Sequence, residues 1–378
     1  MLARFIYISI AALTATVLSV AALSRPDLSP ETVETSETGN ILSALAELPG
    51  DGFAAPDPNW RLTLPGDHAP HDEARTESWQ LHAHLRDESG EDVGFQFSIL
   101  RFAIAETADK LPASAWALRE VYRGHSILQD ASDGTTRAEE RFSRGMEALA
   151  GFDNAASVLR LDNWTLRFDV DGMTLSATSA GEVSIKLELQ PAKSVLSLQP
   201  DGGAAPFAGY AYTRLDVEGT LVRGAGPEVV RGVAWYEHSW GELPVPGAGP
   251  VAWDRVQFQL EDGTDGTFLR SRRRDGRGAA TVNGAFWDQQ GNATALNEDQ
   301  ITMTPTDTWT ANSAGATYPV AWRLQGPAFD LSITPVSETE DHGFAFPMWS
   351  GAVRVTGTRA GETVTGIGTL QLTGYEGQ

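Results

Sequence analysis

The sequence predicts an all-β protein of the antiparallel barrel or sandwich type. From Trp60 onward, apolar and polar residues alternate in one segment after another, and turns rich in glycine and aspartate separate these segments. Long helical periodicity is scarce. Residues 78–102 and 252–274 echo each other, because each has a leading tryptophan, an acidic glycine turn and a return strand with a basic end. With the length of 378 residues, this echo predicts two consecutive barrel-like halves with a seam near residues 224–233.

The N-terminal residues 1–24 predict export. Arg4 precedes an uncharged apolar run from Phe5 to Leu23, and Ala22–Ser24 offers small residues at the −3 and −1 positions of a cleavage site. The alternative is an uncleaved anchor, because the run is almost long enough to span a bilayer. In both cases the remainder of the chain lies across the membrane, so we expect a periplasmic or secreted protein, or one anchored to the inner membrane.

The predicted elements follow in order. Residues 25–55 form an acidic linker, within which residues 41–48 are a candidate short amphipathic helix. We expect a first domain over residues 56–230 and a second over 231–378. Strands are predicted at 78–85, 93–102, 164–170, 184–191, 210–222, 251–260, 266–274 and 352–375, the first two as a hairpin. Residues 137–151 are the best helix candidate, with Gly151 as its C-terminal stop.

Composition excludes several classes of function. The net charge is −22, with 50 acidic against 28 basic residues, which disfavours nucleic acid and anionic membranes as partners. The chain has no cysteine, which excludes disulfides, thiolate metal sites, a cysteine nucleophile and a lipid-modified cysteine. The basic run at residues 270–277 is short, and we interpret it as a solvated strand face.

Two histidines raise the question of a metal. His82 and His84 share one strand face, and such a pair can bind zinc or copper. Polar outward positions on an alternating strand, opposite Leu81 and Leu85, explain the pair more simply. We therefore predict neither a metal site nor another cofactor.

The stretch AWYEHSWGE at residues 234–242 concentrates aromatic rings beside titratable groups. In a strand, Tyr236, His238 and Trp240 point to one face, and Trp235, Glu237 and Ser239 point to the other. The stretch could be a packed corner of the core. It could equally line a site for an apolar molecule.

Asp254 is the second candidate. It shares a strand face with Val256, Phe258 and Leu260, so it is predicted to point inward, which costs free energy unless the carboxylate is paired or neutralised. One interpretation is a structural carboxylate that caps a loop or pairs with a nearby arginine. The other is an acid at the mouth of an aromatic-lined barrel that holds an apolar ligand. We predict that Asp254 faces the interior of the second half or the interface between the halves, within reach of the segment 236–240.

The segment 64–87 resembles a motif of the family that includes acyclic carotenoid 1,2-hydratase (hydroxyneurosporene synthase) and AttH-like proteins. The matching residues are Asp67, His68, His71, Arg75, Glu77 and Trp79. The stretches 124–130, 141–151, 232–242, 251–263 and 348–375 resemble later blocks in the same order. The resemblance runs from about Trp60 to Tyr375. The chain departs from the family pattern at Glu237 and Ser239, where the family more often has Asp and Glu, and at Ser350, where it has Glu.

The resemblance implies two consecutive lipocalin-like barrels in a periplasmic or secreted protein. For some relatives it implies hydration of a double bond in an acyclic carotenoid. In that hypothesis Asp254 is the acid, and His238 or Glu237 holds the attacking water. The ligand-binding candidates are Tyr236, Trp240, Trp253, Trp235, Trp79, Glu77 and Arg75.

The alternative is a non-enzymatic carrier or chaperone for a lipid or other small apolar ligand, as a component of an ABC-type envelope transport system. A third possibility, also implied by the resemblance, is a secreted hydrolase of unknown substrate.

The export prediction has a direct check. N-terminal sequencing of protein from the cell envelope is expected to begin at Arg25, because signal peptidase cleaves after the small residue Ser24. Full-length protein in the cytosol would contradict it.

Overall fold

The structure is a computed structural model. It describes residues 52–104, 118–146, 149–179, 183–198, 206–224, 226–243, 250–311, 315–336, 342, 344–345 and 347–375. The export segment, the candidate helix at 41–48 and nearly all of the acidic linker lie outside the described residues. Within the described residues, no helix is long and apolar enough to cross a membrane.

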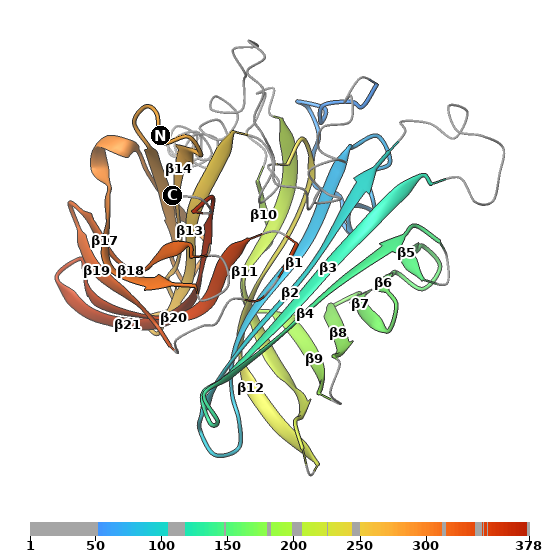
Figure 1. The fold of residues 1–378 in the computed structure, drawn as a ribbon, viewed down its shortest axis with the longest axis horizontal. Helices are drawn as coiled ribbons and strands as arrows, with labels where there is room; N and C mark the ends of the chain where they lie inside the picture. The colour runs from blue at the N-terminus through green and yellow to red at the C-terminus, as the bar shows by residue number, and fades with distance from the viewer. Residues whose placement is uncertain are drawn as a thin grey trace. The chain divides into compact units, whose positions relative to one another are not determined.

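The described strands form two antiparallel sheets of 12 and 9 strands (Figure 1), which confirms the predicted all-β class. The first sheet contains β1 (Thr76–Arg86), β2 (Asp92–Ala103), β3 (Glu120–Asp130), β4 (Thr135–Arg144), β5 (Ala150–Asp153), β6 (Val158–Leu161), β7 (Trp164–Asp169), β8 (Gly172–Thr178), β9 (Ser184–Pro191), β10 (Leu196–Ser197), β11 (Phe207–Val222) and β12 (Pro227–Gly241). The second sheet contains β13 (Val251–Leu260), β14 (Asp265–Arg273), β15 (Thr281–Trp287), β16 (Ala293–Leu296), β17 (Thr302–Thr310), β18 (Thr317–Gly326), β19 (Phe329–Pro335), β20 (Met348–Arg359) and β21 (Glu362–Thr373). Two single-turn 3-10 helices are described, η1 (Gly66–His68) and η3 (Glu298–Gln300).

Both sheets have the same topology. Each is a meander of neighbouring antiparallel strands in which the first strand also pairs with the last, β1 with β12 and β13 with β21. This pairing brings the two ends of each meander together, as in a barrel, and among the described strands the edges are β4 and β5 in the first sheet and β16 and β17 in the second. The echoing segments 78–102 and 252–274 correspond to the hairpins β1–β2 and β13–β14, which take equivalent places in their sheets.

The period of two decides which side chains form the core. In β1 the row Trp79, Leu81, Ala83 and Leu85 is buried, as the alternation predicts. In β13 the row Val256, Phe258 and Leu260 is buried in the core of the second sheet. Each sheet therefore has an apolar core of its own.

The predicted helix over residues 137–151 is wrong. Residues 135–144 form β4, which pairs with β3 along its whole length. The apparent helical spacing of charges comes from cross-strand contacts, since Arg123 Nε donates to Glu140 Oε1 at 2.7 Å. Gly151 lies in β5, where its φ of 148° suits glycine.

The boundary between the halves also differs from the expected one. The expected boundary at residues 230/231 falls inside β12, whose pairing with β1 and β11 continues to Gly241. The described residues divide into two compact units after Leu243. The stretch 234–242 therefore belongs almost entirely to the first sheet.

A glycine in the pairing of β1 with β12 offers a test of this closure. A Cβ atom added at Gly232 would lie 1.9 Å from the backbone oxygen of His84, so the strands must move apart to accept it. We expect Gly232→Ala to lower the free energy of unfolding by about 1–3 kcal/mol, the usual cost of overpacking.

Gly226→Ala is the matched control, because a Cβ there meets no atom within 4 Å. It should stay within about 0.5 kcal/mol of the parent protein. Urea unfolding measures both, and equal effects would contradict the described strand pairing.

Candidate functional site

The candidate site lies on the inner face of the first sheet, where β1, β12 and β11 run side by side. Trp79 of β1 is the register partner of His238 in β12, and His238 is the partner of Tyr210 in β11. Because paired residues point to the same face of a sheet, these three rings meet. The rings of Trp79 and His238 stack with their centroids 4.6 Å apart.

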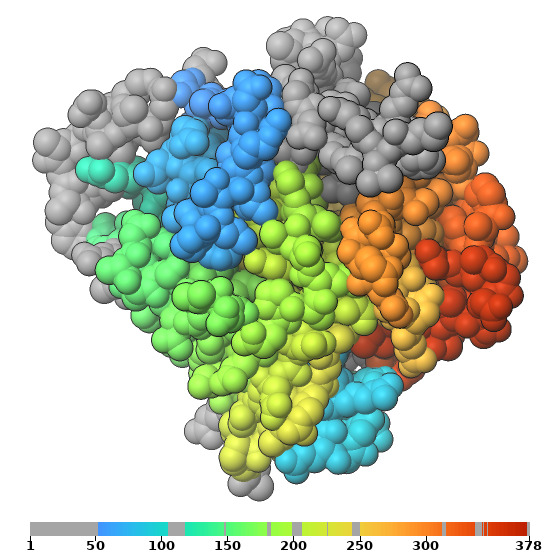
Figure 2. All heavy atoms as spheres, turned by 180° about the vertical axis from the view of Figure 1, so that it is seen from behind, coloured from blue at the N-terminus to red at the C-terminus, as the bar shows by residue number. Residues whose placement is uncertain are grey.

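The segment before β1 brings further groups to this face. It contains η1 and places His71 over Trp240, with the rings 3.5 Å apart and nearly parallel. Trp60 meets the edge of Trp240 at 4.9 Å. In Figure 2 the blue stretch that contains this segment lies against the green surface of the first sheet.

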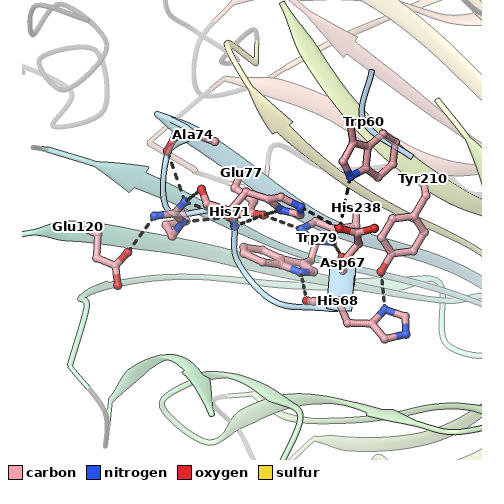
Figure 3. Close-up of polar contacts among 11 residues, drawn as sticks. Trp60, Asp67, His68, His71, Ala74, Glu77, Trp79, Glu120, Tyr210 and His238 are labelled. Carbon is pink, nitrogen blue, oxygen red and sulfur yellow. Dashed lines mark hydrogen bonds and ion pairs between the residues drawn. The ribbon is translucent and has the colours of Figure 1, made fainter. Parts of the chain in front are cut away.

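Glu77 is the hub of the polar contacts, and its side chain has no exposed surface. Its Oε1 lies 2.9 Å from His71 Nδ1 and 2.9 Å from His238 Nε2. Its Oε2 accepts from Arg101 Nε at 3.1 Å. The backbone N–H of His71 also donates to both oxygens, at 3.1 Å each. Figure 3 shows His71 and His238 converging on Glu77 from two different elements.

Asp67 completes a ring of contacts. Its Oδ1 lies 3.3 Å from His71 Nε2, and its backbone oxygen lies 2.9 Å from His238 Nδ1. The contacts therefore run from Asp67 through His71, Glu77 and His238 back to Asp67. Both ring nitrogens of His238 are used within the protein, which leaves neither to hold a water.

The surroundings shift the pKa values of these groups. Burial alone would raise the pKa of Glu77, but hydrogen bonds from His238 and His71, with the charges of His238 and Arg101, lower it to about 2. Burial lowers the pKa of His238, against the opposing effect of Glu77. Burial and the charge of His238 lower the pKa of His68 to about 4.

A group of tyrosines extends the same inner face. Tyr210 hydrogen-bonds His68 Nδ1 through its hydroxyl at 2.6 Å, and its ring lies 6.0 Å from that of Tyr236. The Tyr236 hydroxyl is buried and has no partner in hydrogen-bonding geometry. The Tyr210 hydroxyl interacts with the Tyr236 hydroxyl and lowers its pKa against the larger effect of burial, but the two hydroxyls do not meet in good hydrogen-bonding geometry. Burial raises the pKa of both phenols, so both are neutral.

The first sheet brings together five of the predicted site residues. They are Glu77, Trp79, Tyr236, His238 and Trp240, all buried on the inner face. Trp235 and Glu237 lie on the opposite face, where Trp235 Nε1 donates to Glu237 Oε1 at 3.0 Å. Glu237 therefore does not share the inner face with His238. Arg75 directly precedes β1 and is half-buried.

Asp254 belongs to the second sheet and is fully buried, as its place in the alternation predicts. It accepts from Arg270 Nη1 at 2.6 Å and from the Tyr375 hydroxyl at 2.8 Å, and Arg272 Nε lies at 3.6 Å. Burial raises the pKa of Asp254, whereas Arg272 and Arg270 lower it.

These contacts correct one expectation and leave another open. The basic run at 270–277 is only partly a solvated strand face. Arg270 and Arg272 lie beside the buried Asp254 and neutralise it, whereas Arg273 pairs with Asp275 at the surface. Trp253 is half-buried on the strand face opposite Asp254. The predicted reach from Asp254 to the segment 236–240 stays a prediction, since the two belong to different units.

The site also contains Asp67, His71, Arg101 and Tyr210, which are not among the residues predicted from the sequence. The inward direction of Arg101 could have been predicted, because it continues the inward row Phe95, Phe97 and Ile99 in β2. His82 and His84 are buried on the other face of β1, and burial with the charge of His82 lowers the pKa of His84 to about 3. Among the described residues, the group with three potential metal ligands is His71, Glu77 and His238, without this pair.

Comparisons with known proteins agree with this architecture. A family model described as AttH-like matches residues 55–375. A crystal structure of an AttH-type protein from Nitrosomonas europaea superposes with a TM-score of 0.74 at 25% identity, covering 86% of this chain and 100% of that one. No curated protein matches the chain in sequence.

Two further structures share the fold. Kievitone hydratase from Nectria haematococca has a TM-score of 0.61 at 11% identity and covers 85% of this chain and 95% of its own. CghA, in a complex with Sch210972, has a TM-score of 0.51 at 16% identity and covers 87% and 98%. The likeness confirms the expected two-domain, lipocalin-type fold.

The ion pairs of Arg270 with Asp254 and of Arg273 with Asp275 allow a test of the protonation state of Asp254. If its carboxylate is ionised, Asp254→Asn leaves the half-buried Arg270 and the buried Arg272 without their counter-charge and lowers the free energy of unfolding by about 3 kcal/mol. Asp275→Asn breaks a pair at the surface beside the same strand and should change stability little. Urea unfolding near neutral pH compares them. Equally small effects would show that Asp254 is protonated in the folded protein.

Proposed function

The chain belongs to the AttH-like family, and from this premise we propose that it is an exported lipocalin-like protein that binds an apolar, isoprenoid- or lipid-like ligand and adds water across a carbon–carbon double bond. The ligand would lie against the inner face of the first sheet. This proposal retains the enzyme hypothesis of the sequence analysis and changes the residues that carry it.

One observation carries the proposal, the Tyr236 hydroxyl. It is a buried polar group whose interaction with the Tyr210 hydroxyl falls outside good hydrogen-bonding geometry, and the rings of Tyr210, Tyr212 and Phe168 surround it. Buried hydroxyl groups normally have a partner, so an unpaired one inside an aromatic enclosure suits a water or a ligand oxygen. Because His238 has no free nitrogen, Tyr236 is the better candidate to position the attacking water.

The chemistry requires three things of the protein. A proton donor adds H⁺ to one alkene carbon, aromatic faces stabilise the resulting cation, and water bonds to the other carbon and returns a proton to the donor's conjugate base. Asp254, the acid expected from the sequence, belongs to the unit that contains the second sheet, where burial raises its pKa and its ion pairs favour the carboxylate. The comparison of Asp254→Asn with Asp275→Asn separates these two states.

A non-enzymatic carrier is the second candidate, and the ion pairs of Asp254 favour it. A carboxylate bound by Arg270 and close to Arg272 is ionised and carries no proton to donate, and an apolar carrier needs no acid at all. Such a carrier would deliver its ligand to an envelope transport system of the ABC type.

We expect Tyr236→Phe to separate the two candidates. The change removes a single oxygen, so binding of an acyclic isoprenoid, followed by tryptophan fluorescence, should stay within a few-fold. Hydration, followed by mass spectrometry in ¹⁸O-water, should fall about 100-fold if the hydroxyl positions the water.

Tyr212→Phe is the control, because Tyr212 is a neighbouring ring that is only half-buried. It should leave turnover unchanged. Saturable binding with no labelled product in the parent protein would favour the carrier, and absence of both binding and product would contradict both candidates.

A further inference from the structure

We propose that His71, Glu77 and His238 bind a divalent transition-metal ion of the zinc class on the inner face of the first sheet. The inference goes beyond the proposed function and does not depend on it. It also departs from the sequence analysis, which weighed His82 and His84 as ligands and expected no metal.

The ring nitrogens of His71 and His238 face more hydrogen-bond acceptors than two neutral imidazoles can satisfy. All four ring nitrogens of His71 and His238 face oxygen acceptors, two on Glu77 Oε1 and two on Asp67. A neutral imidazole has one N–H to donate and a charged one has two. Hydrogen bonds alone satisfy all four contacts only if both rings are imidazolium ions.

Two imidazolium rings fit this place poorly. Their centroids would lie 5.7 Å apart, and the Arg101 guanidinium already holds the other oxygen of Glu77. Three cationic groups would then meet at Glu77, which has no exposed surface, while Asp67 and Glu120 each pair with one of them from the side. Like charges at such distances disfavour each other's ionisation.

A divalent ion accounts for all four contacts of the two rings, and it adds the same charge as two protons would. Each ring then keeps one N–H for Asp67 and directs its lone pair, beside Glu77 Oε1, towards the ion. Metal-binding histidines characteristically donate their other N–H to a carboxylate or a backbone carbonyl. Asp67 supplies one of each, its side chain to His71 and its backbone oxygen to His238 (Figure 3).

The distances are compatible with an ion. The three ligand atoms lie within 4.8 Å of one another, and Oε1 is 2.9 Å from each nitrogen. Tetrahedral zinc with bonds of about 2.0–2.1 Å separates its ligands by about 3.4 Å. Each nitrogen must therefore move about half an ångström away from Oε1, and the two nitrogens must approach each other by up to about 1.4 Å. Arg101 holds Oε2 of Glu77 and so leaves Oε1 as the ligand atom.

Two imidazoles and one carboxylate indicate the class of metal. Imidazole suits zinc, copper, nickel and iron, whereas magnesium and calcium prefer sites made only of oxygen. Three protein ligands leave a fourth position for water or another small ligand, the pattern of open zinc sites.

The test uses the full chain, stripped with a chelator and titrated with Co²⁺ near neutral pH. We expect visible d–d absorption that saturates at one equivalent and disappears when Zn²⁺ is added, with one zinc per chain by elemental analysis. X-ray absorption of the zinc form should show two imidazoles in the first coordination sphere. Binding should weaken as the pH falls, because protons compete for the same nitrogens.

The variants identify the site. His71→Gln and His238→Gln should weaken Co²⁺ binding by more than about 100-fold. His68→Gln is the matched control, since His68 is buried in the same segment but bonds Tyr210, and it should bind as the parent protein does. Absence of Co²⁺ binding by the folded parent protein, equal loss in His68→Gln, or ¹⁵N shifts showing both rings as imidazolium would each overturn the proposal.

Discussion

A carboxylate without exposed surface is the constraint around which the first sheet is arranged. Glu77 must be neutralised where it lies, and three elements contribute to this: Arg101 from β2, His238 from β12 and His71 from the segment before β1. The same contacts hold the segment before β1 against the sheet, because His71 bonds Glu77 of β1 and the backbone oxygen of Asp67 bonds His238 of β12. The position of η1, the pairing of β1 with β12 and the packing of the aromatic rings therefore all meet at this carboxylate.

The two sheets repeat this arrangement in a reduced form. In each hairpin, an inward acid of the first strand faces an arginine of the second in direct register, Glu77 with Arg101 and Asp254 with Arg270. The similarity between the two sequence segments therefore corresponds to an acid–arginine pair at the equivalent place in both hairpins. The difference lies in what else the acid meets, histidines in the first sheet and Arg272 with Tyr375 in the second. One topology therefore carries two different polar centres.

The sequence predicted the fold better than the site, for a physical reason. Alternation shows which face a side chain takes, so the inward direction of His238 and of Asp254 could be predicted locally. It does not show which strand lies beside which, and the meeting of Glu77 with His238 depends on the pairing of β1 with β12. The false helix at 137–151 has a related origin, since charges paired across strands can imitate helical spacing. The stop expected at Gly151 is a strand position of β5 with a positive φ.

The contacts of Glu77 also differ in how far they reach along the chain. Arg101 is separated from it by 24 residues, whereas His238 is separated by 161. During synthesis from the N-terminus, both members of the Glu77–Arg101 pair are present long before the imidazole of β12 leaves the ribosome. A nascent chain that ends between β2 and β12 therefore contains the acid and its arginine but not His238, so the polar centre can be completed only when the last strand of the first sheet has been made.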